Sequence, residues 1–169
     1  MTGFRCALLA CAVSIALASG SRGVMAQAGG DPPPPPTTAN CQILEIKASN
    51  EGDGVDPDLK PLARKLKKPP FSSWKAFKLL KRHDKTVEKM KALNLGLVTG
   101  SKLTLLFRGA SGGQTHKTRL RLGFTLDDKN GKRKVDGTIN VDSGDYSLIG
   151  GDTIEGGATY IVAVSCKAP

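Results

Sequence analysis

Four cysteines in this 169-residue chain indicate its most specific chemistry. Cys6 and Cys11 lie within an apolar N-terminal stretch, whereas Cys41 and Cys166 lie near the two ends of the chain that follows. In an oxidising compartment an isolated pair of thiols more often forms a disulfide than a metal or redox site. We therefore predict a disulfide between Cys41 and Cys166, the alternative being two free buried thiols. No CxxC motif or His/Cys cluster is present, so we expect no metal site and no cofactor.

Positive charge is concentrated in one segment. Residues 60–91 carry twelve Lys or Arg side chains against two acidic ones, within a chain of formal net charge +10. Aromatic side chains interleave with these cations, a combination that suits single-stranded nucleic acid or a membrane interface. Candidate anion-binding residues are Trp74, Lys75, Lys78, Lys81 and Arg82. The alternative is that the aromatic rings anchor the core while the lysine stems extend from it to solvent.

Residue types that could support hydrolysis are few. His83 and His116 both lie in polar stretches typical of turns, and we expect them to be solvated. A triad assembled from a distant serine and an aspartate, such as Ser111 with Asp84 or Asp145, has no motif to support it. We therefore predict no catalytic residues and no enzyme activity.

An acidic loop precedes the basic segment. Residues 50–58 hold five side chains with the hard oxygen ligands that Ca²⁺ prefers, but their spacing does not match an EF-hand loop. Turn formation and helix capping by Asp56 or Asp58 account for the same residues. We favour capping over calcium binding.

The N-terminus has the pattern of a secretory signal peptide. Arg5 precedes an uncharged apolar run over residues 7–18, which is too short to span a bilayer. We predict cleavage after residue 26 and a secreted or periplasmic protein. The alternative, a lipoprotein acylated at Cys11, would cut the apolar run through its middle.

A proline-rich spacer is predicted next. Residues 27–40 include five consecutive prolines, which favour an extended polyproline II conformation without internal hydrogen bonds. We interpret this stretch as a disordered tether, with a proline-rich ligand for a partner as the alternative. Residues 41–169 then have a suitable length for a single β-rich domain.

The first and last predicted strands can position the two thiols. Residues 41–49 alternate so that Cys41, Ile43 and Glu45 share one face, and apolar residues occupy both faces. In residues 158–166, Cys166 shares a face with Tyr160. The two strands are therefore predicted to be neighbours joined by the disulfide.

Between these strands the pattern is mainly β. Alternating segments are separated by Gly-rich turns, with Asn130-Gly131 as the strongest hairpin signal. This pattern predicts an all-β fold, an antiparallel sandwich or barrel, with one short helix near residues 58–67. Residues 71–93 fit either a helix or two strand pieces, and we favour strands, with a turn at 81–85.

Three stretches of the chain carry a resemblance. Residues 68–82, 41–49 and 146–165 together resemble a group of small exported bacterial proteins to which no activity is assigned. The resemblance implies a bacterial origin and a β-rich secreted domain, and it brings no site residues.

These observations favour an exported, non-enzymatic β-domain that acts by binding or as an accessory envelope or extracellular protein. The first alternative is an anion-binding module, for lipopolysaccharide, phospholipid, acidic polysaccharide or nucleic acid, that uses the basic segment 60–91. The second alternative is a secreted hydrolase or a hydrolase inhibitor. A histidine held with a carboxylate in a concave site would favour this last class.

Overall fold

The computed structural model describes residues 34–112 and 117–169. The predicted signal peptide, residues 27–33 of the predicted spacer and His116 lie outside these residues. The described elements are β1 (Thr38–Ser49), β2 (Gly54–Val55), η1 (Pro57–Leu62), α1 (Ala63–Leu66), η2 (Phe71–Ser73), β3 (Ala76–Glu88), β4 (Ala92–Gly96), β5 (Lys102–Ser111), β6 (Arg119–Asp127), β7 (Arg133–Asp142), β8 (Tyr146–Ile154), η3 (Glu155–Gly157) and β9 (Ala158–Lys167).

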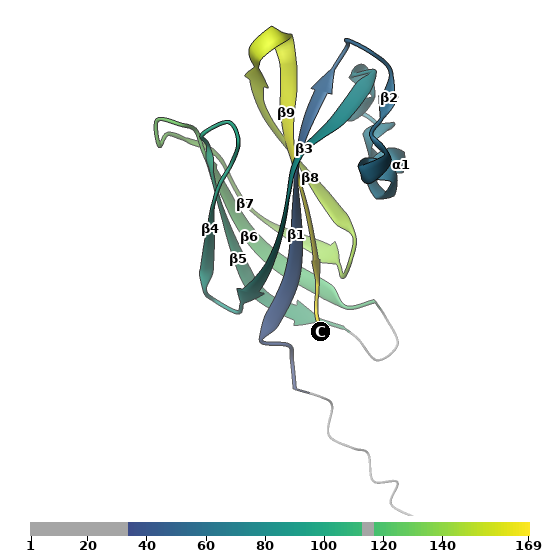
Figure 1. Ribbon diagram of the computed structural model, residues 1–169. Helices are drawn as coiled ribbons and strands as arrows, with labels where there is room; N and C mark the ends of the chain where they lie inside the picture. The colour runs from purple at the N-terminus through teal and green to yellow at the C-terminus, as the bar shows by residue number, and fades with distance from the viewer. Residues whose placement is uncertain (1–33, 113–116) are drawn as a thin grey trace, which may run out of the picture. The chain divides into compact units, whose positions relative to one another are not determined.

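Residues 34–169 form a sandwich of two sheets (Figure 1). Sheet A has the strand order β2-β3-β1-β9-β8, and sheet B has the order β4-β5-β6-β7. Every strand pair is antiparallel apart from the short parallel pair of β2 with β3. The predicted fold class, a mainly antiparallel β-sandwich with one short helix, is confirmed.

The main core lies between the two sheets. Alternate residues of β1 and β9 face alternate residues of β5 and β6, as the two-residue period of a strand requires. Fully buried examples are Ile43 and Val162 from sheet A with Phe107, Leu120 and Leu122 from sheet B. Cys41, Tyr160 and Cys166 lie in the same cluster, so the predicted faces of the first and last strands are confirmed.

A second core covers the opposite face of sheet A. Leu59, Leu62 and Leu66, from η1 and α1, are fully buried against β1, β3 and β9. Each buried leucine contributes about 2 kcal/mol of apolar transfer free energy. In Figure 1, α1 accordingly lies on the side of sheet A away from β4–β7. Strands β1 and β9 are thus covered on both faces, which explains their nearly continuous apolar sequences.

The helical segment begins at a capping aspartate, as predicted. The Asp56 carboxylate accepts a hydrogen bond from the backbone N–H of Asp58 at 3.0 Å and one from the N–H of Leu79 at 3.2 Å. The first bond satisfies a free N–H at the start of η1. The second ties the start of the helical segment to β3.

Strand β3 corrects one prediction. The expected turn at 81–85 is wrong, because these residues continue the strand and pair with residues 41–45 of β1. The register shifts at Leu80, which stands as the extra residue of a β-bulge between the pairs Ile46–Leu79 and Glu45–Lys81. The bulge breaks the two-residue alternation of the sequence, so one continuous strand looks like two pieces. Helical structure in 71–93 is confined to η2.

The body also begins earlier than expected. Strand β1 starts at Thr38, so Thr38–Asn40, assigned from the sequence to the spacer, belong to the sheet. Asn40 pairs with Thr86, whose hydroxyl donates to the Asn40 Oδ1 at 2.9 Å. Because of these contacts, β1 begins two residues after the last proline of the run.

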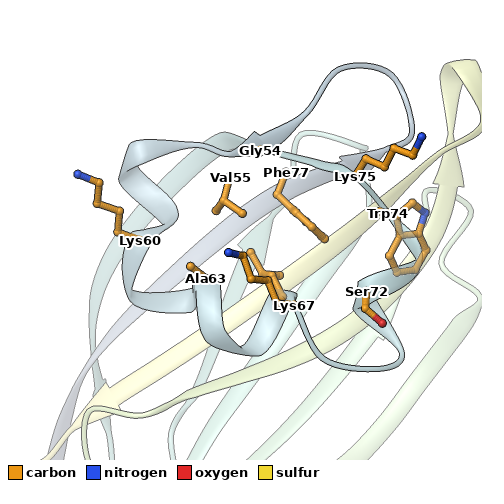
Figure 2. A pocket seen from close by; sticks show the side chains of 10 residues that line it. Gly54, Val55, Lys60, Ala63, Lys67, Ser72, Trp74, Lys75 and Phe77 are labelled. Carbon is orange, nitrogen blue, oxygen red and sulfur yellow. The ribbon is translucent and has the colours of Figure 1, made fainter.

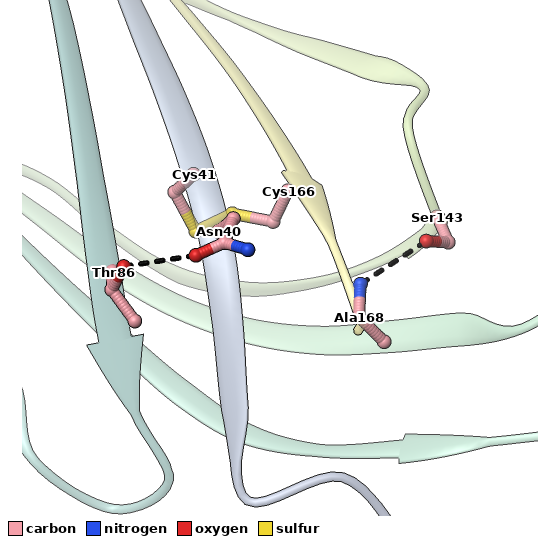
Figure 3. Close-up of a disulfide and its surroundings, with 6 residues drawn as sticks. All are labelled: Asn40, Cys41, Thr86, Ser143, Cys166 and Ala168. Carbon is pink, nitrogen blue, oxygen red and sulfur yellow. Dashed lines mark hydrogen bonds between the residues drawn. A yellow bond between two sulfur atoms is a disulfide. The ribbon is translucent and has the colours of Figure 1, made fainter.

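The two cysteines of the predicted disulfide lie on neighbouring strands. Cys41 lies directly opposite Cys166 in the β1–β9 pair, with their Cα atoms 4.0 Å apart, and the two sulfurs form a disulfide (Figure 3). The adjoining end of β9 is held by the Ala168 N–H, which donates to the Ser143 Oγ at 3.2 Å. The disulfide therefore fastens the first strand to the last.

Candidate functional site

The five predicted anion-binding residues do not converge on one site. Trp74 packs against the second core, on the face of sheet A that the helical segment covers. Lys78 and Lys81 pair with Lys47 and Glu45 of β1, so they lie on the face towards sheet B. The bulge at Leu80 brings Lys78 and Lys81 to the same face, while strand alternation places Arg82, opposite Leu44, on the other face.

Arg82 lies near an acidic residue of the loop that precedes the helical segment. Its guanidinium lies 3.7 Å from the Asp58 carboxylate, so this cation is partly neutralised by the acidic loop. Lys75 lies beside Trp74, and only these two of the five predicted residues line the same hollow. Of the predicted anion-binding residues, Trp74 and Lys75 are therefore the two that remain together at one candidate site.

That hollow, which we call the flank hollow, lies between the helical segment and the end of sheet A. Its volume is about 450 Å³ (Figure 2). Its lining residues are Gly54, Val55, Lys60, Ala63, Leu66, Lys67, Ser72, Trp74, Lys75 and Phe77. In Figure 2, Val55 and Phe77 lie side by side, while Lys60 and Lys75 lie at opposite sides of the hollow. The flank hollow therefore combines an apolar floor with a cationic rim.

Trp74 lines the flank hollow and pairs with the ring of Phe71, which lies outside the lining. The rings of Phe71 and Trp74 have centroids 6.4 Å apart and planes tilted by 36°. The Trp74 N–H donates to the Phe71 carbonyl at 3.2 Å, which fixes the short η2 turn between them. Trp74 is half-buried, so part of its indole remains available to a ligand.

Within the described part of the chain, the lysines of the rim have no carboxylate partners. Lys60, Lys67 and Lys75 are exposed, and none makes an ion pair with another residue of the described part of the chain. No acidic residue lines the flank hollow. Three ammonium groups thus lie around an apolar surface, and no described carboxylate neutralises their positive charge. This arrangement attracts anions.

A neighbouring hollow has mixed charge. It measures about 530 Å³ and is lined by the acidic loop residues Glu51, Asp53 and Asp56 together with Lys47 and Lys78. These opposite charges cancel much of one another's field. The flank hollow is therefore the better anion site of the two.

A buried carboxylate was not anticipated from the sequence. Glu45 of β1 is fully buried, and its Oε1 lies 2.6 Å from the Nε2 of His83. Its Oε2 accepts the backbone N–H of Val98 at 2.8 Å and the hydroxyl of Tyr160. We call Glu45, His83, Tyr160 and Val98 the Glu45 cluster. Burial and the hydrogen bond to Glu45 raise the pKa of Tyr160 far above its usual value.

The expectation of a solvated turn histidine is wrong for His83. Its side chain is only 10% exposed and belongs to a strand, because β1 brings Glu45 beside it. In a catalytic triad one ring nitrogen of the histidine bonds to a carboxylate, and the other ring nitrogen must bond to a nucleophilic side chain. Within residues 34–112 and 117–169, no Ser, Thr or Cys side chain hydrogen-bonds to His83.

One sequence signal could have identified the Glu45 cluster. Glu45 occupies a core-facing position of a strand whose neighbours Cys41 and Ile43 are apolar, and a buried charge requires partners. The signal does not say which residues those partners are. His83 and Tyr160 lie 38 and 115 residues away in the chain, so only the sheet pairing reveals them.

The acidic loop is used within the fold. Asp56 caps η1 and Asp58 lies near Arg82, as described above. In the part of the chain that the structure describes, no group of three or more His, Cys, Asp or Glu side chains is placed to hold a metal ion. Across the same residues, no helix has the length and apolar character needed to cross a membrane.

Comparison with protein-family models, with curated protein sequences and with solved structures finds no match to this chain.

Proposed function

We propose that this protein is an exported, non-enzymatic binding domain that holds phosphate-bearing lipid surfaces at the flank hollow. The observation that carries the proposal is the group of three exposed lysines without carboxylate partners, Lys60, Lys67 and Lys75, around an apolar floor with Trp74 at one end. Lysine attracts phosphate as a point charge, while an indole is suited to the boundary between headgroups and acyl chains.

Export is supported by two features. A disulfide such as Cys41–Cys166 persists in an oxidising compartment, and the pattern of residues 1–26 is that of a signal peptide. A secreted or periplasmic domain would meet anionic lipid headgroups, including those of lipopolysaccharide. The proposed ligand and the proposed compartment are therefore compatible.

The test uses the fluorescence of Trp74, which is the chain's single tryptophan. The exported chain is titrated with phosphatidylcholine vesicles that contain or lack phosphatidylglycerol. We expect a blue shift of Trp74 emission with the anionic vesicles alone, and we expect added salt to weaken it.

The decisive variant is the triple substitution Lys60→Gln, Lys67→Gln and Lys75→Gln. At about 1 kcal/mol for each lysine near an anionic surface, it should weaken vesicle binding by about a hundredfold. The matched control replaces Lys85, Lys102 and Lys132, which are equally exposed and do not line the hollow, by Gln. An equal loss in both triple variants, or no loss in the first, would contradict the proposal.

A further inference from the structure

A second hollow lies on the other side of sheet A, between the two sheets. It measures about 800 Å³ and opens where the β4–β5 turn and the β6–β7 turn approach the end of β8. Its aliphatic lining consists of Leu80, Val98, Leu126 and Ile154. We call this hollow the sandwich mouth. Its volume lies within the range of about 300 to 1,000 Å³ that is typical of small-molecule sites.

The mouth displays apolar surface that the fold leaves uncovered. Leu80 is 38% exposed and Val98 is 49% exposed. Together with Met90 they are the exposed large apolar side chains among residues 34–112 and 117–169, and both of them line the mouth. Scattered single exposed residues are ordinary, but two on facing elements of one hollow indicate a surface for an apolar ligand.

The charge of the mouth favours an anion. Lys47 and Lys129 line it, and neither makes an ion pair with another described residue. Among the side chains that the structure describes, the one carboxylate lining the mouth is that of Asp128, which accepts the backbone N–H groups of Asn130 and Lys132 at 2.9 Å each and lies 4.0 Å from the Lys134 ammonium. Asp128 is thus occupied within its own turn. Lys129 remains for a ligand, and Lys47, which also borders the acidic loop, is the second cation within reach.

The walls of the mouth are fixed in place. The Val98 N–H donates to the buried Glu45 carboxylate at 2.8 Å, so the β4–β5 turn of sheet B is tied to β1 of sheet A. Tyr160, whose hydroxyl donates to the same carboxylate, also lines the mouth. A preformed hollow of this kind needs little reorganisation to accept a ligand.

We infer that the sandwich mouth binds a single-chain amphiphile with an anionic head, of the fatty-acid type. Its acyl chain lies among the four aliphatic side chains, and its head lies near Lys47 and Lys129. This site is separate from the flank hollow, because Lys47 and Tyr160 pair across β1 and β9 on the face towards sheet B. The two sites therefore require independent tests.

The test is calorimetric titration of the exported chain with laurate below its micelle concentration. We expect saturable binding of one laurate per chain, and no comparable binding of the uncharged detergent dodecyl maltoside. The double variant Lys47→Gln/Lys129→Gln and the double variant Leu80→Asn/Val98→Asn should each weaken laurate binding at least tenfold. The control Lys85→Gln/Lys102→Gln, at exposed lysines that line neither the mouth nor the flank hollow, should leave laurate binding unchanged.

Backbone amide shifts in the unaltered chain keep the test independent of how the variants fold. Laurate should shift the amide signals of Val98, Thr99 and Leu126. Absence of saturable laurate binding, equal binding of the neutral detergent, or amide shifts confined to the flank hollow would overturn the inference. An equal loss in the Lys85→Gln/Lys102→Gln control would also overturn it, whereas failure of vesicle binding alone would affect only the proposed function.

Discussion

At the scale of single residues, Glu45 has the most demanding environment. A carboxylate taken fully out of water costs several kcal/mol unless donors surround it. Glu45 has the Val98 N–H, the Tyr160 hydroxyl and the ring of His83. These donors come from three separate elements, so the carboxylate links β3, β9 and the β4–β5 turn to β1.

Replacing Glu45 with Ala should destabilise the fold by about 3 to 5 kcal/mol, because the Val98 N–H, the Tyr160 hydroxyl and the His83 ring lose their acceptor. Replacing it with Gln should cost less, since the amide oxygen still accepts the Val98 N–H. The measurement is the free energy of unfolding in denaturant. Glu51→Ala, in an exposed loop, serves as the control and should change stability by less than about 0.5 kcal/mol. Equal effects at positions 45 and 51 would contradict this account.

A second prediction concerns the ionisation of the two tyrosines of the chain, Tyr146 and Tyr160. Burial is the main cause that raises the pKa of both Tyr146 and Tyr160 in the folded state. A group with a raised pKa stabilises the fold below its unfolded value, about 10 for tyrosine, and this contribution is lost as the pH rises above it. Phenolate absorbance should therefore stay low at pH 10 in the native protein and appear together with alkaline unfolding. A separate phenolate step before unfolding would contradict the prediction.

At the scale of elements, the helical segment depends on leucine burial and on one polar tie to a distant turn. The Lys65 ammonium donates to the Asp145 carboxylate at 2.7 Å and to the Tyr146 carbonyl. The hydrogen bond from Lys65 is the main cause that lowers the pKa of Asp145. Both side chains are substantially exposed, so water screens the pair and it contributes at most about 1 kcal/mol.

This tie predicts a pH dependence. Because the folded-state pKa of Asp145 is lowered, the pair adds stability above the ordinary aspartate value of about 4, and this is lost as the pH falls through the folded-state pKa. The free energy of unfolding should therefore fall more between pH 7 and pH 3 in the unaltered chain than in Asp145→Asn. Equal losses in the two proteins would show that the pair is not coupled to folding.

Much of the element pattern is local and could be predicted from the sequence. Gly131 has the positive φ of 78° that the Asn-Gly signal requires, and its N–H donates to the Asp128 carbonyl at 2.9 Å. The leucine spacing and the Asp56 cap likewise predicted the helical segment. The bulge at Leu80 could not be predicted, because its cause is the pairing of β3 with β1 rather than any local preference.

The candidate sites were less predictable than the elements, for a related reason. Lys81 and Arg82 are adjacent in the sequence, yet the strand directs their side chains to opposite faces. The flank hollow needs Lys60 and Lys67 from the helical segment, and these residues lie near Trp74 because the leucines of that segment pack on sheet A. Proximity in the sequence therefore did not predict which side chains would lie on the same face of the sheet.

At the scale of the whole molecule, β1 and β9 form the centre of sheet A and carry residues of both cores. Their disulfide closes a loop with a sequence separation of 125 residues. Cross-linking so long a loop restricts the unfolded chain strongly, by the loop-entropy argument. The disulfide therefore acts on the stability of the entire domain rather than on one hairpin.

Replacing Cys41 and Cys166 together by Ser should lower the free energy of unfolding by about 4 kcal/mol. The measurement is denaturant unfolding of this variant beside the oxidised parent, and the reduced parent should resemble the variant. Mass spectrometry of the exported chain checks the premise, since the disulfide lowers the mass by two hydrogens. A parent mass without that loss would contradict the predicted pairing.

The position of the disulfide also determines how the domain responds to mechanical force. Cys41 and Cys166 lie opposite each other at one end of the first and last strands, with Cα atoms 4.0 Å apart. Tension applied to the chain before Cys41 and after Cys166 passes from one cysteine to the other through covalent bonds. The strands between them carry none of that tension, so both hollows keep their shape under a pull that would extend the reduced chain.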